Sequence, residues 1–165
     1  MPHHNEGRYD AIMAAPLYHL GITLTPSQQA LAQIDLLPIN TPLQPPQTAL
    51  AQRIVQQLSH YLHNPHTPFT IPLALGGTPF QQQVWQYLQT IPCGETRTYQ
   101  QLAMQMNTSP RAIGGACRRN PIPLLIPCHR VVAKTGIGGF DGQQQGMKIH
   151  FKHWLLAHET RPPML

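Results

Sequence analysis

A cysteine, a histidine and an arginine stand side by side at Cys128-His129-Arg130, inside the apolar stretch PIPLLIPCHRVV of residues 121–132. A cysteine becomes a nucleophile as its thiolate, which nearby cations such as Arg130 or a protonated His129 favour. Histidine can take the thiol proton as a general base. The trio therefore predicts a reactive cysteine, although a single cysteine in a run of Val, Ile and Leu is also typical of a packed core residue.

The apolar residues on both sides predict a buried strand over 124–132, interrupted at Pro127. Because successive strand side chains point to opposite faces, we expect His129 to reach Cys128 through a bridging water. A carboxylate could hold the histidine ring in the required orientation. From residue 95 onward the acidic residues are Glu95, Asp141 and Glu159.

The chain has three cysteines, Cys93, Cys117 and Cys128, so they cannot all pair, and we expect reduced thiols. Cys93 follows a helix and is interpreted as a small hydrophobic residue. No C-x-x-C spacing occurs, which disfavours a structural zinc site. We therefore expect neither a metal nor a cofactor.

Composition indicates a soluble protein with one domain, or one domain and a small partner. Hydrophobic residues make up 41% of the 165 residues, which is enough for a core. No apolar run approaches the roughly 18 residues of a membrane span, and the first ten residues lack the apolar core of a signal peptide. We expect a cytoplasmic protein that does not bind membranes.

One helix and two short strands are predicted before residue 70. Leucine and isoleucine recur at four-residue spacing in the helix expected from Gln47, which Asn64-Pro65 should end: Leu50, Ile54, Leu58 and Leu62. Two short strands are expected around the turn at Thr25-Pro26-Ser27.

Two further helices flank the Cys-His-Arg trio. Thr78 and Pro79 suit the N-cap and first position of a helix whose apolar stripe runs from Phe80 to Ile91. The last helix is expected over 148–158, with Glu159 just past its end.

Residues 98–119 predict two short helices joined by a tight turn. Ser109 suits the N-cap of the second helix, so Arg111 should lie in its opening turn. Gly114 and Gly115 weaken a helix by roughly 1 kcal/mol each, which the close approach of another backbone or surface would explain. The pattern is typical of a DNA-binding helix-turn-helix, whose second helix usually enters the major groove, but plain helical hairpins are also common.

Charge is concentrated in the same part of the chain. Residues 96–140 hold six basic residues and no acidic residue. Such a segment favours a polyanionic partner, although a solvated basic face would have the same composition.

Several of these segments together resemble the O6-alkylguanine-DNA alkyltransferase family, also called methylated-DNA–protein-cysteine methyltransferases. The resemblance lies in TYQQLA, RAIGGACRRNPIPLL, IPCHRVV and KHWLLAHE, within about residues 78–160. It implies an α+β fold, in which a small ribonuclease-H-like α/β domain (1–70) and a linker (71–77) precede a mainly helical domain (78–165). That second domain would carry the helix-turn-helix and the active-site strand and turn.

The resemblance also implies roles for individual residues. Cys128 would accept the alkyl group, with His129 as its water-mediated base and Glu159 orienting that base. Asn120 would brace the active-site turn, and Tyr99 would assist the departing guanine. In DNA binding, Arg111 would enter the base stack, and further contacts would come from Thr98, Ala112, Gly115 and Arg118. The substrate pocket would include Cys117, Pro123, Phe140 and Asp141.

The implied activity is the repair of O6-alkylguanine, with O4-methylthymine as a further substrate. The base is inaccessible to a thiol inside the duplex, so it must be flipped out. Because nothing nearby could cleave the resulting thioether, each molecule would react once. The resemblance further implies a monomer that binds the minor groove of double-stranded DNA largely independently of sequence.

Two departures from the family pattern lie near the implied pocket. DGQQQGMKIH adds roughly five residues before the last helix, and Phe140 stands where the family usually has Tyr. Three other functions stay open: a damage sensor that binds the lesion without transfer, a helix-turn-helix regulator in which Cys128 is a core residue, and a cysteine hydrolase.

Overall fold

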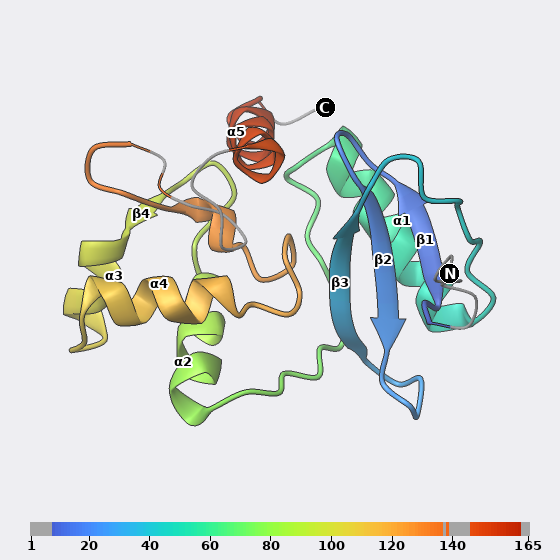
Figure 1. Ribbon diagram of the computed structural model, residues 1–165, viewed down its shortest axis with the longest axis horizontal. Helices are drawn as coiled ribbons and strands as arrows, with labels where there is room; N and C mark the ends of the chain where they lie inside the picture. Colours follow the sequence, from blue (N-terminus) through green and yellow to red (C-terminus); the bar gives the residue numbers. More distant parts are fainter. Residues whose placement is uncertain (1–7, 137, 139–145, 163–165) are drawn as a thin grey trace. The chain divides into compact units, whose positions relative to one another are not determined.

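The computed structural model describes residues 8–136, 138 and 146–162, and these form two compact units, Met1–Leu75 and Gly76–Leu165. In the described ranges helices and strands are mixed, so the fold is α+β (Figure 1). No helix of these ranges is long and apolar enough to cross a membrane.

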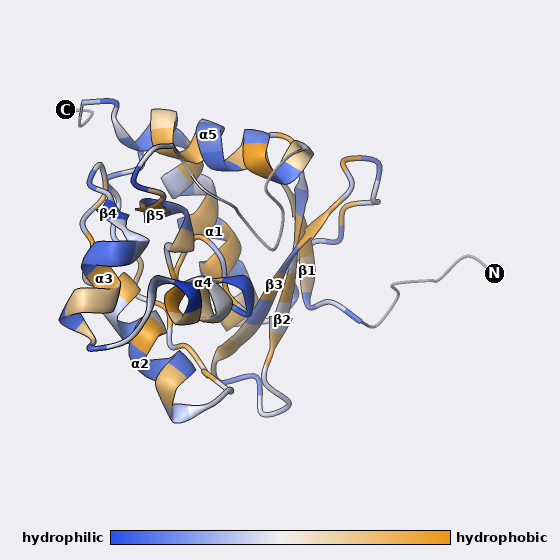
Figure 2. Ribbon diagram, turned by 60° about the vertical axis from the view of Figure 1, so that its left-hand side comes forward, coloured by the Kyte–Doolittle hydropathy of each residue, from blue (hydrophilic) through white to orange (hydrophobic). Residues whose placement is uncertain are grey.

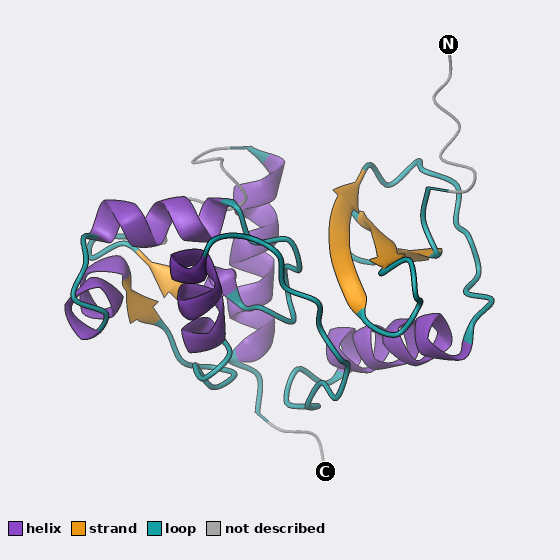
Figure 3. Ribbon diagram, turned by 90° about the horizontal axis from the view of Figure 1, so that it is seen from below, coloured by secondary structure: helices purple, strands orange, loops and turns teal. Residues whose placement is uncertain are grey.

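The described part of the first unit is an antiparallel sheet with one helix. The strands β1 (Ala11–Ala14), β2 (His19–Leu24) and β3 (Leu31–Leu37) pair in chain order. Helix α1 (Ala49–His63) lies along the sheet (Figure 3). The strands around the Thr25–Ser27 turn and the helix that ends before Asn64 are confirmed, whereas β1 was not predicted.

The first unit buries its apolar side chains between the sheet and α1. Leu20 and Ile22 of β2 and Ile54 and Leu58 of α1 are fully buried. Colouring by hydropathy shows the strands mainly in the hydrophobic colour (Figure 2). The α1 N-terminus is capped by the Thr48 side chain, which accepts a hydrogen bond from the Ala51 amide.

The second unit is mainly helical. It contains α2 (Pro79–Leu88), α3 (Tyr99–Gln105), α4 (Pro110–Arg118) and α5 (Met147–Glu159). The short strands β4 (Arg97–Thr98) and β5 (Val131–Val132) pair in parallel among these helices (Figure 3). The Trp85 indole N–H donates to the Ala116 carbonyl over 2.9 Å and so ties α2 to α4.

Local capping signals located these helices well. Thr78 and Thr98 each form a capping box, and Ser109 caps α4 through the Ala112 amide. The end of α2 was predicted too late, because the helix ends at Leu88 and Ile91 is buried in the following turn. Glu159 is the last residue of α5 and does not lie beyond it.

The strand predicted over 124–132 is wrong for most of its length. Leu124 has a positive φ of 78°, and Cys128–Arg130 form a 3₁₀ turn, η1, so only Val131–Val132 is a strand. The residues are buried as predicted, but a folded loop buries them. The apolar run therefore indicated burial correctly and extended structure incorrectly.

Candidate active site

The Cys-His-Arg trio lies in the buried turn η1. Cys128 is 7% exposed, and His129 is completely buried. The Cys128 amide donates to the Ile126 carbonyl over 2.8 Å, and the Arg130 amide donates to the Pro127 carbonyl over 3.0 Å. Because the turn is 3₁₀, the strand alternation that separated Cys128 from His129 in the sequence prediction does not apply.

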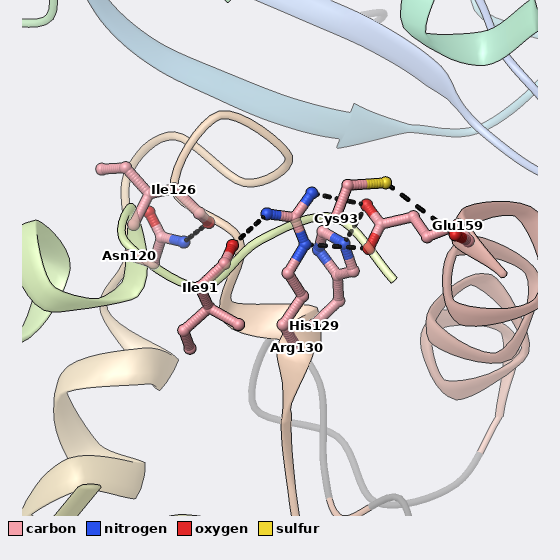
Figure 4. Close-up of polar contacts among 7 residues, drawn as sticks. All are labelled: Ile91, Cys93, Asn120, Ile126, His129, Arg130 and Glu159. Atoms are coloured by element: carbon pink, nitrogen blue, oxygen red, sulfur yellow. Dashed lines mark hydrogen bonds and ion pairs between the residues drawn. The ribbon is translucent and has the colours of Figure 1, made fainter. Parts of the chain in front are cut away.

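Glu159 joins His129 and Arg130 in one buried network (Figure 4). Its Oε2 atom lies 2.8 Å from His129 Nε2. Arg130 donates from Nε to Oε1 over 2.8 Å and from Nη2 to Oε2 over 2.9 Å. A third donor of the guanidinium, Nη1, bonds the Ile91 carbonyl over 2.6 Å. The C-terminal residue of α5 thus meets the turn that carries the cysteine.

The network fixes the charge states of its members. Burial alone would raise the pKa of Glu159, but the bonds from His129 and Arg130 outweigh it and hold that pKa well below its usual range. Burial lowers the pKa of His129, against the opposing effect of Glu159. Glu159 is therefore an ionised carboxylate and His129 a neutral imidazole near neutral pH.

The other ring nitrogen of His129 faces no described acceptor or donor. Nδ1 is buried and has no hydrogen-bond partner among the residues that the structure describes. A buried polar atom of this kind usually has a partner. Nδ1 is thus the ring nitrogen that Glu159 does not engage.

Asn120 holds the loop that leads to Cys128. Its Nδ2 donates to the Ile126 carbonyl over 2.8 Å, and its Oδ1 accepts from the Ile122 amide over 2.9 Å. The Ile126 amide also bonds the Ile122 carbonyl over 3.0 Å. These bonds close the loop and explain why it is not extended.

A lysine that the sequence analysis did not identify lies beside the same site. Lys152 of α5 has no exposed surface, and its Nζ donates to the Val131 carbonyl over 2.8 Å. Burial lowers its pKa to about 8, while negative charge on the nearby Cys128 and Cys117 sulfur atoms acts in the opposite direction. The available signal was its position on the buried stripe of α5, three residues after Ile149 and three before Leu155.

Tyr99 and Gly138 border this group. The Lys152 ammonium lies 6.0 Å from the centre of the Tyr99 ring. Burial, followed by negative charge on the Cys117 and Cys128 sulfur atoms, raises the pKa of Tyr99, so its hydroxyl stays protonated as a hydrogen-bond donor. Gly138 has a φ of +76°, and a Cβ there would lie 3.0 Å from the Tyr99 ring.

The implied pocket residues are only partly described. Cys117 is buried on α4, and burial followed by the charge of Cys128 raises its pKa. Pro123 is buried in the loop closed by Asn120. Phe140 and Asp141 lie outside the described residues. Within the described ranges no group of three or more His, Cys, Asp and Glu side chains could hold a metal ion.

The residues implied in DNA binding lie on α3 and α4. Thr98 caps α3, while Arg111, Gly115 and Arg118 are exposed on α4 and Ala112 is half-buried. A Cβ at Gly115 would meet nothing within 4 Å. We expected the close approach of another surface to explain this glycine, and no described part of the chain provides that surface.

Known proteins resemble the part of the chain that holds this site. The family model "6-O-methylguanine DNA methyltransferase, DNA binding domain" matches residues 79–161. A methylated-DNA–protein-cysteine methyltransferase of Shigella flexneri is 47% identical over 93 residues, which are 54% of this chain and 52% of that protein. The chain spans about half the length of the curated relatives of this kind that it matches.

A solved structure covers more of the chain. The O6-methylguanine methyltransferase of Mycobacterium tuberculosis is 32% identical, and the match covers 90% of each chain with a TM-score of 0.74. The same protein in complex with DNA matches with a TM-score of 0.73, at 32% identity over 90% of this chain and 91% of that one. The family match over more than half of the residues and this likeness together show that the chain belongs to the O6-methylguanine-DNA methyltransferase family.

Proposed function

We propose that this protein repairs O6-alkylguanine in DNA by transferring the alkyl group irreversibly to Cys128. The observation that carries the proposal is the buried contact of His129 with the Glu159 carboxylate, next to Cys128 in the same turn. Methyl transfer to a protein cysteine is the activity named for the Shigella flexneri relative.

The reaction begins with the thiol proton. The Cys128 proton passes through a bridging water to Nδ1 of His129, and Glu159 stabilises the imidazolium that forms. The thiolate attacks the alkyl carbon, so that an S–C bond forms while the bond from that carbon to guanine O6 breaks. Tyr99 donates a hydrogen bond to the departing guanine anion. That anion takes up a proton from water, and the imidazolium of His129 returns the thiol proton to water, so the protons balance. Asn120 keeps the Cys128 loop in place.

The product explains why each molecule reacts once. A thioether on Cys128 has no leaving group that a neighbouring side chain could displace, so the protein is consumed by its reaction. We extend the proposal to O4-methylthymine, which presents an alkyl carbon on an exocyclic oxygen in the same way. We assign the substrate pocket to Cys117 and Pro123, together with Phe140 and Asp141, which lie outside the described residues.

DNA binding is assigned to α3 and α4 acting as a helix-turn-helix in the minor groove. Support comes from the exposed Arg111 in the opening turn of α4 and from the open space at Gly115, which lets a DNA surface approach the helix. Thr98, Ala112 and Arg118 provide further contacts. Arg111 fills the gap in the base stack after the damaged nucleotide leaves it.

The two units have different tasks in this proposal. The first, with its three-stranded antiparallel sheet and α1, corresponds to the ribonuclease-H-like domain of residues 1–70, and residues 71–77 form a linker. Residues 78–165 bind DNA and accept the alkyl group. The protein acts as a monomer with little sequence preference and needs no cofactor.

Replacing Cys128 with serine tests the activity. Cys128→Ser should abolish conversion of O6-methylguanine to guanine in a duplex, because a serine hydroxyl is far less acidic than a thiol. Binding to the same duplex should persist. Base analysis of the DNA and a binding titration measure the two properties.

Cys93→Ser is the matched control. The thiol of Cys93 is half-buried and contacts the main-chain carbonyl of Glu159, so this variant should repair DNA normally. Repair by Cys128→Ser would assign the nucleophile elsewhere. Lesion-selective binding without repair by the wild-type protein would indicate a damage sensor, and binding to one preferred sequence would indicate a regulator.

Arg111→Ala should separate base flipping from chemistry. We expect the variant to repair duplex O6-methylguanine about 10–100-fold more slowly, while its reaction with free O6-benzylguanine changes less than about two-fold. Single-turnover rates with the two substrates give the comparison. Arg53→Ala, on the exposed face of α1, is the control, and equal losses with both substrates would contradict the flipping role.

A further inference from the structure

Arg130 is a buried cation to which the reaction described above gives no task. Its side chain is 11% exposed, and its guanidinium bonds both oxygens of Glu159, from Nε over 2.8 Å and from Nη2 over 2.9 Å. A bidentate ion pair of this kind holds a carboxylate in one orientation more firmly than a single hydrogen bond does. Figure 4 shows the arginine and His129 on the same carboxylate.

The position of this carboxylate determines which nitrogen of His129 carries a proton. An ionised carboxylate can only accept hydrogen bonds, and Glu159 Oε2 lies 2.8 Å from Nε2. The proton of the neutral ring must therefore be on Nε2. The lone pair is then on Nδ1, the buried nitrogen that has no partner among the described residues.

A protonated carboxyl group would reverse this arrangement. It would donate its proton to Nε2, the ring proton would move to Nδ1, and His129 could no longer accept a proton there. Arg130 opposes that state, because its two bonds favour the ionised form of Glu159.

Arg130 also affects the pKa of His129 directly. Glu159 and Lys152 lie on α5, and Arg130 and Cys128 belong to the turn of His129 itself. Burial lowers the pKa of His129 most; Glu159 raises that pKa, whereas Arg130 and Lys152 lower it further. Cys93, from the segment after α2, lies 3.9 Å from the Glu159 carbonyl oxygen. Burial raises the pKa of Cys93 to about 11, so its thiol stays neutral at neutral pH.

We propose that Arg130 is a positioning residue for the base: by holding both oxygens of Glu159 it keeps the proton of His129 on Nε2 and leaves Nδ1 to receive the thiol proton. The inference rests on the proposed function, because it assigns a role in the same proton transfer. The signature motif therefore contains the nucleophile, its base and the residue that orients the base through Glu159.

Two substitutions separate the charge of Arg130 from its bulk. Arg130→Met removes the cation, so His129 should hold its proton to higher pH, and the acid limb of the pH–rate profile should move upward by about one pH unit. Transfer at neutral pH should fall about ten-fold or more. Arg130→Lys keeps the charge and should leave the limb in place. Single-turnover reaction with free O6-benzylguanine, which needs no DNA binding, measures both profiles.

Nitrogen-15 NMR of the histidine ring supplies a second readout. In the wild-type protein His129 should be neutral at neutral pH with its proton on Nε2, and in Arg130→Met it should be protonated or carry its proton on Nδ1. Arg53→Met, an arginine removed from the exposed face of α1, is the control for both measurements and should match the wild type.

An unchanged pH profile in Arg130→Met, with only a lower melting temperature, would reduce Arg130 to a structural brace and overturn the inference. If that variant does not fold, the NMR spectrum of His129 in the wild-type protein is the remaining test. A proton on Nδ1 there would contradict the proposal. Absence of transfer by the wild-type protein would instead contradict the proposed function, and the NMR measurement would still test Arg130 because it needs no alkylated substrate.

Discussion

Replacing Glu159 with glutamine is expected to lower the free energy of unfolding by about 3–5 kcal/mol and to slow methyl transfer by about 100-fold or more. Glu159 is 1% exposed and is the carboxylate partner of both His129 and Arg130. Glutamine has the same shape but only one oxygen. Its amide group would place a donor against either the guanidinium or the imidazole N–H, and the arginine would be a buried charge without its counter-ion.

Chemical denaturation and single-turnover kinetics measure the two effects. The stabilisation from Glu159 should be complete above the pKa of an unfolded glutamate, about 4.3, and should be lost as the pH falls toward the lowered pKa of the folded state. The difference between variant and wild type should therefore shrink in acid.

Glu95→Gln is the matched control. Glu95 pairs with Arg97 at the surface over 3.2 Å, and exposed pairs of this kind contribute at most about 1 kcal/mol. Equal stability losses for the two glutamine variants, or normal methyl transfer by Glu159→Gln, would contradict the central position given to Glu159.

Replacing Lys152 with methionine is expected to slow methyl transfer by about 10–100-fold without lowering stability. The ammonium is the cation of α5 that acts on Cys128, so its loss should raise the free energy of the thiolate. Burying the charge costs roughly 3 kcal/mol, judged from a pKa of about 8 against 10.5 in the unfolded chain. Methionine removes that cost and loses the bond to the Val131 carbonyl, which is worth about 1–3 kcal/mol.

The lowered pKa of Lys152 also determines how its effects on stability and on transfer change with pH. Between about pH 8 and 10.5 the unfolded chain holds more protons on this lysine than the folded protein does, so its contribution to stability should rise with pH. Transfer by the wild type should weaken over the same range as the cation is lost, and Lys152→Met should lack that limb.

Reaction with free O6-benzylguanine and thermal melting test this prediction together. Lys134→Met removes an exposed lysine that follows β5 in the sequence and should change the reaction less than about two-fold. A parallel loss of stability and transfer in Lys152→Met would show that the lysine acts through the fold.

Elements with local signals were predicted well from the sequence. Thr78-Pro79 and Ser109-Pro110 each place a capping side chain before a proline, so the starts of α2 and α4 follow from a few neighbouring residues. Of the periodic apolar residues of α1, Ile54 and Leu58 are buried as expected, whereas Leu50 and Leu62 are only half-buried.

Features that depend on distant contacts were not predictable in the same way. The run from Leu124 to Val132 resembles a strand, yet the two bonds of Asn120 fold its first half into a loop. From spacing alone Glu159 was one of three possible carboxylates, and the resemblance to the family selected it. The burial of Lys152 depends on how α5 packs against η1, which sequence patterns do not report.

The most direct measurement is the mass of the intact protein after incubation with an excess of duplex DNA that carries one O6-methylguanine. We predict the gain of one methyl group per molecule and no further gain with time, and peptide mapping should place the methyl group on Cys128. A methyl group on Cys93 or Cys117, continued uptake, or an unchanged mass alongside repaired DNA would contradict irreversible transfer to Cys128.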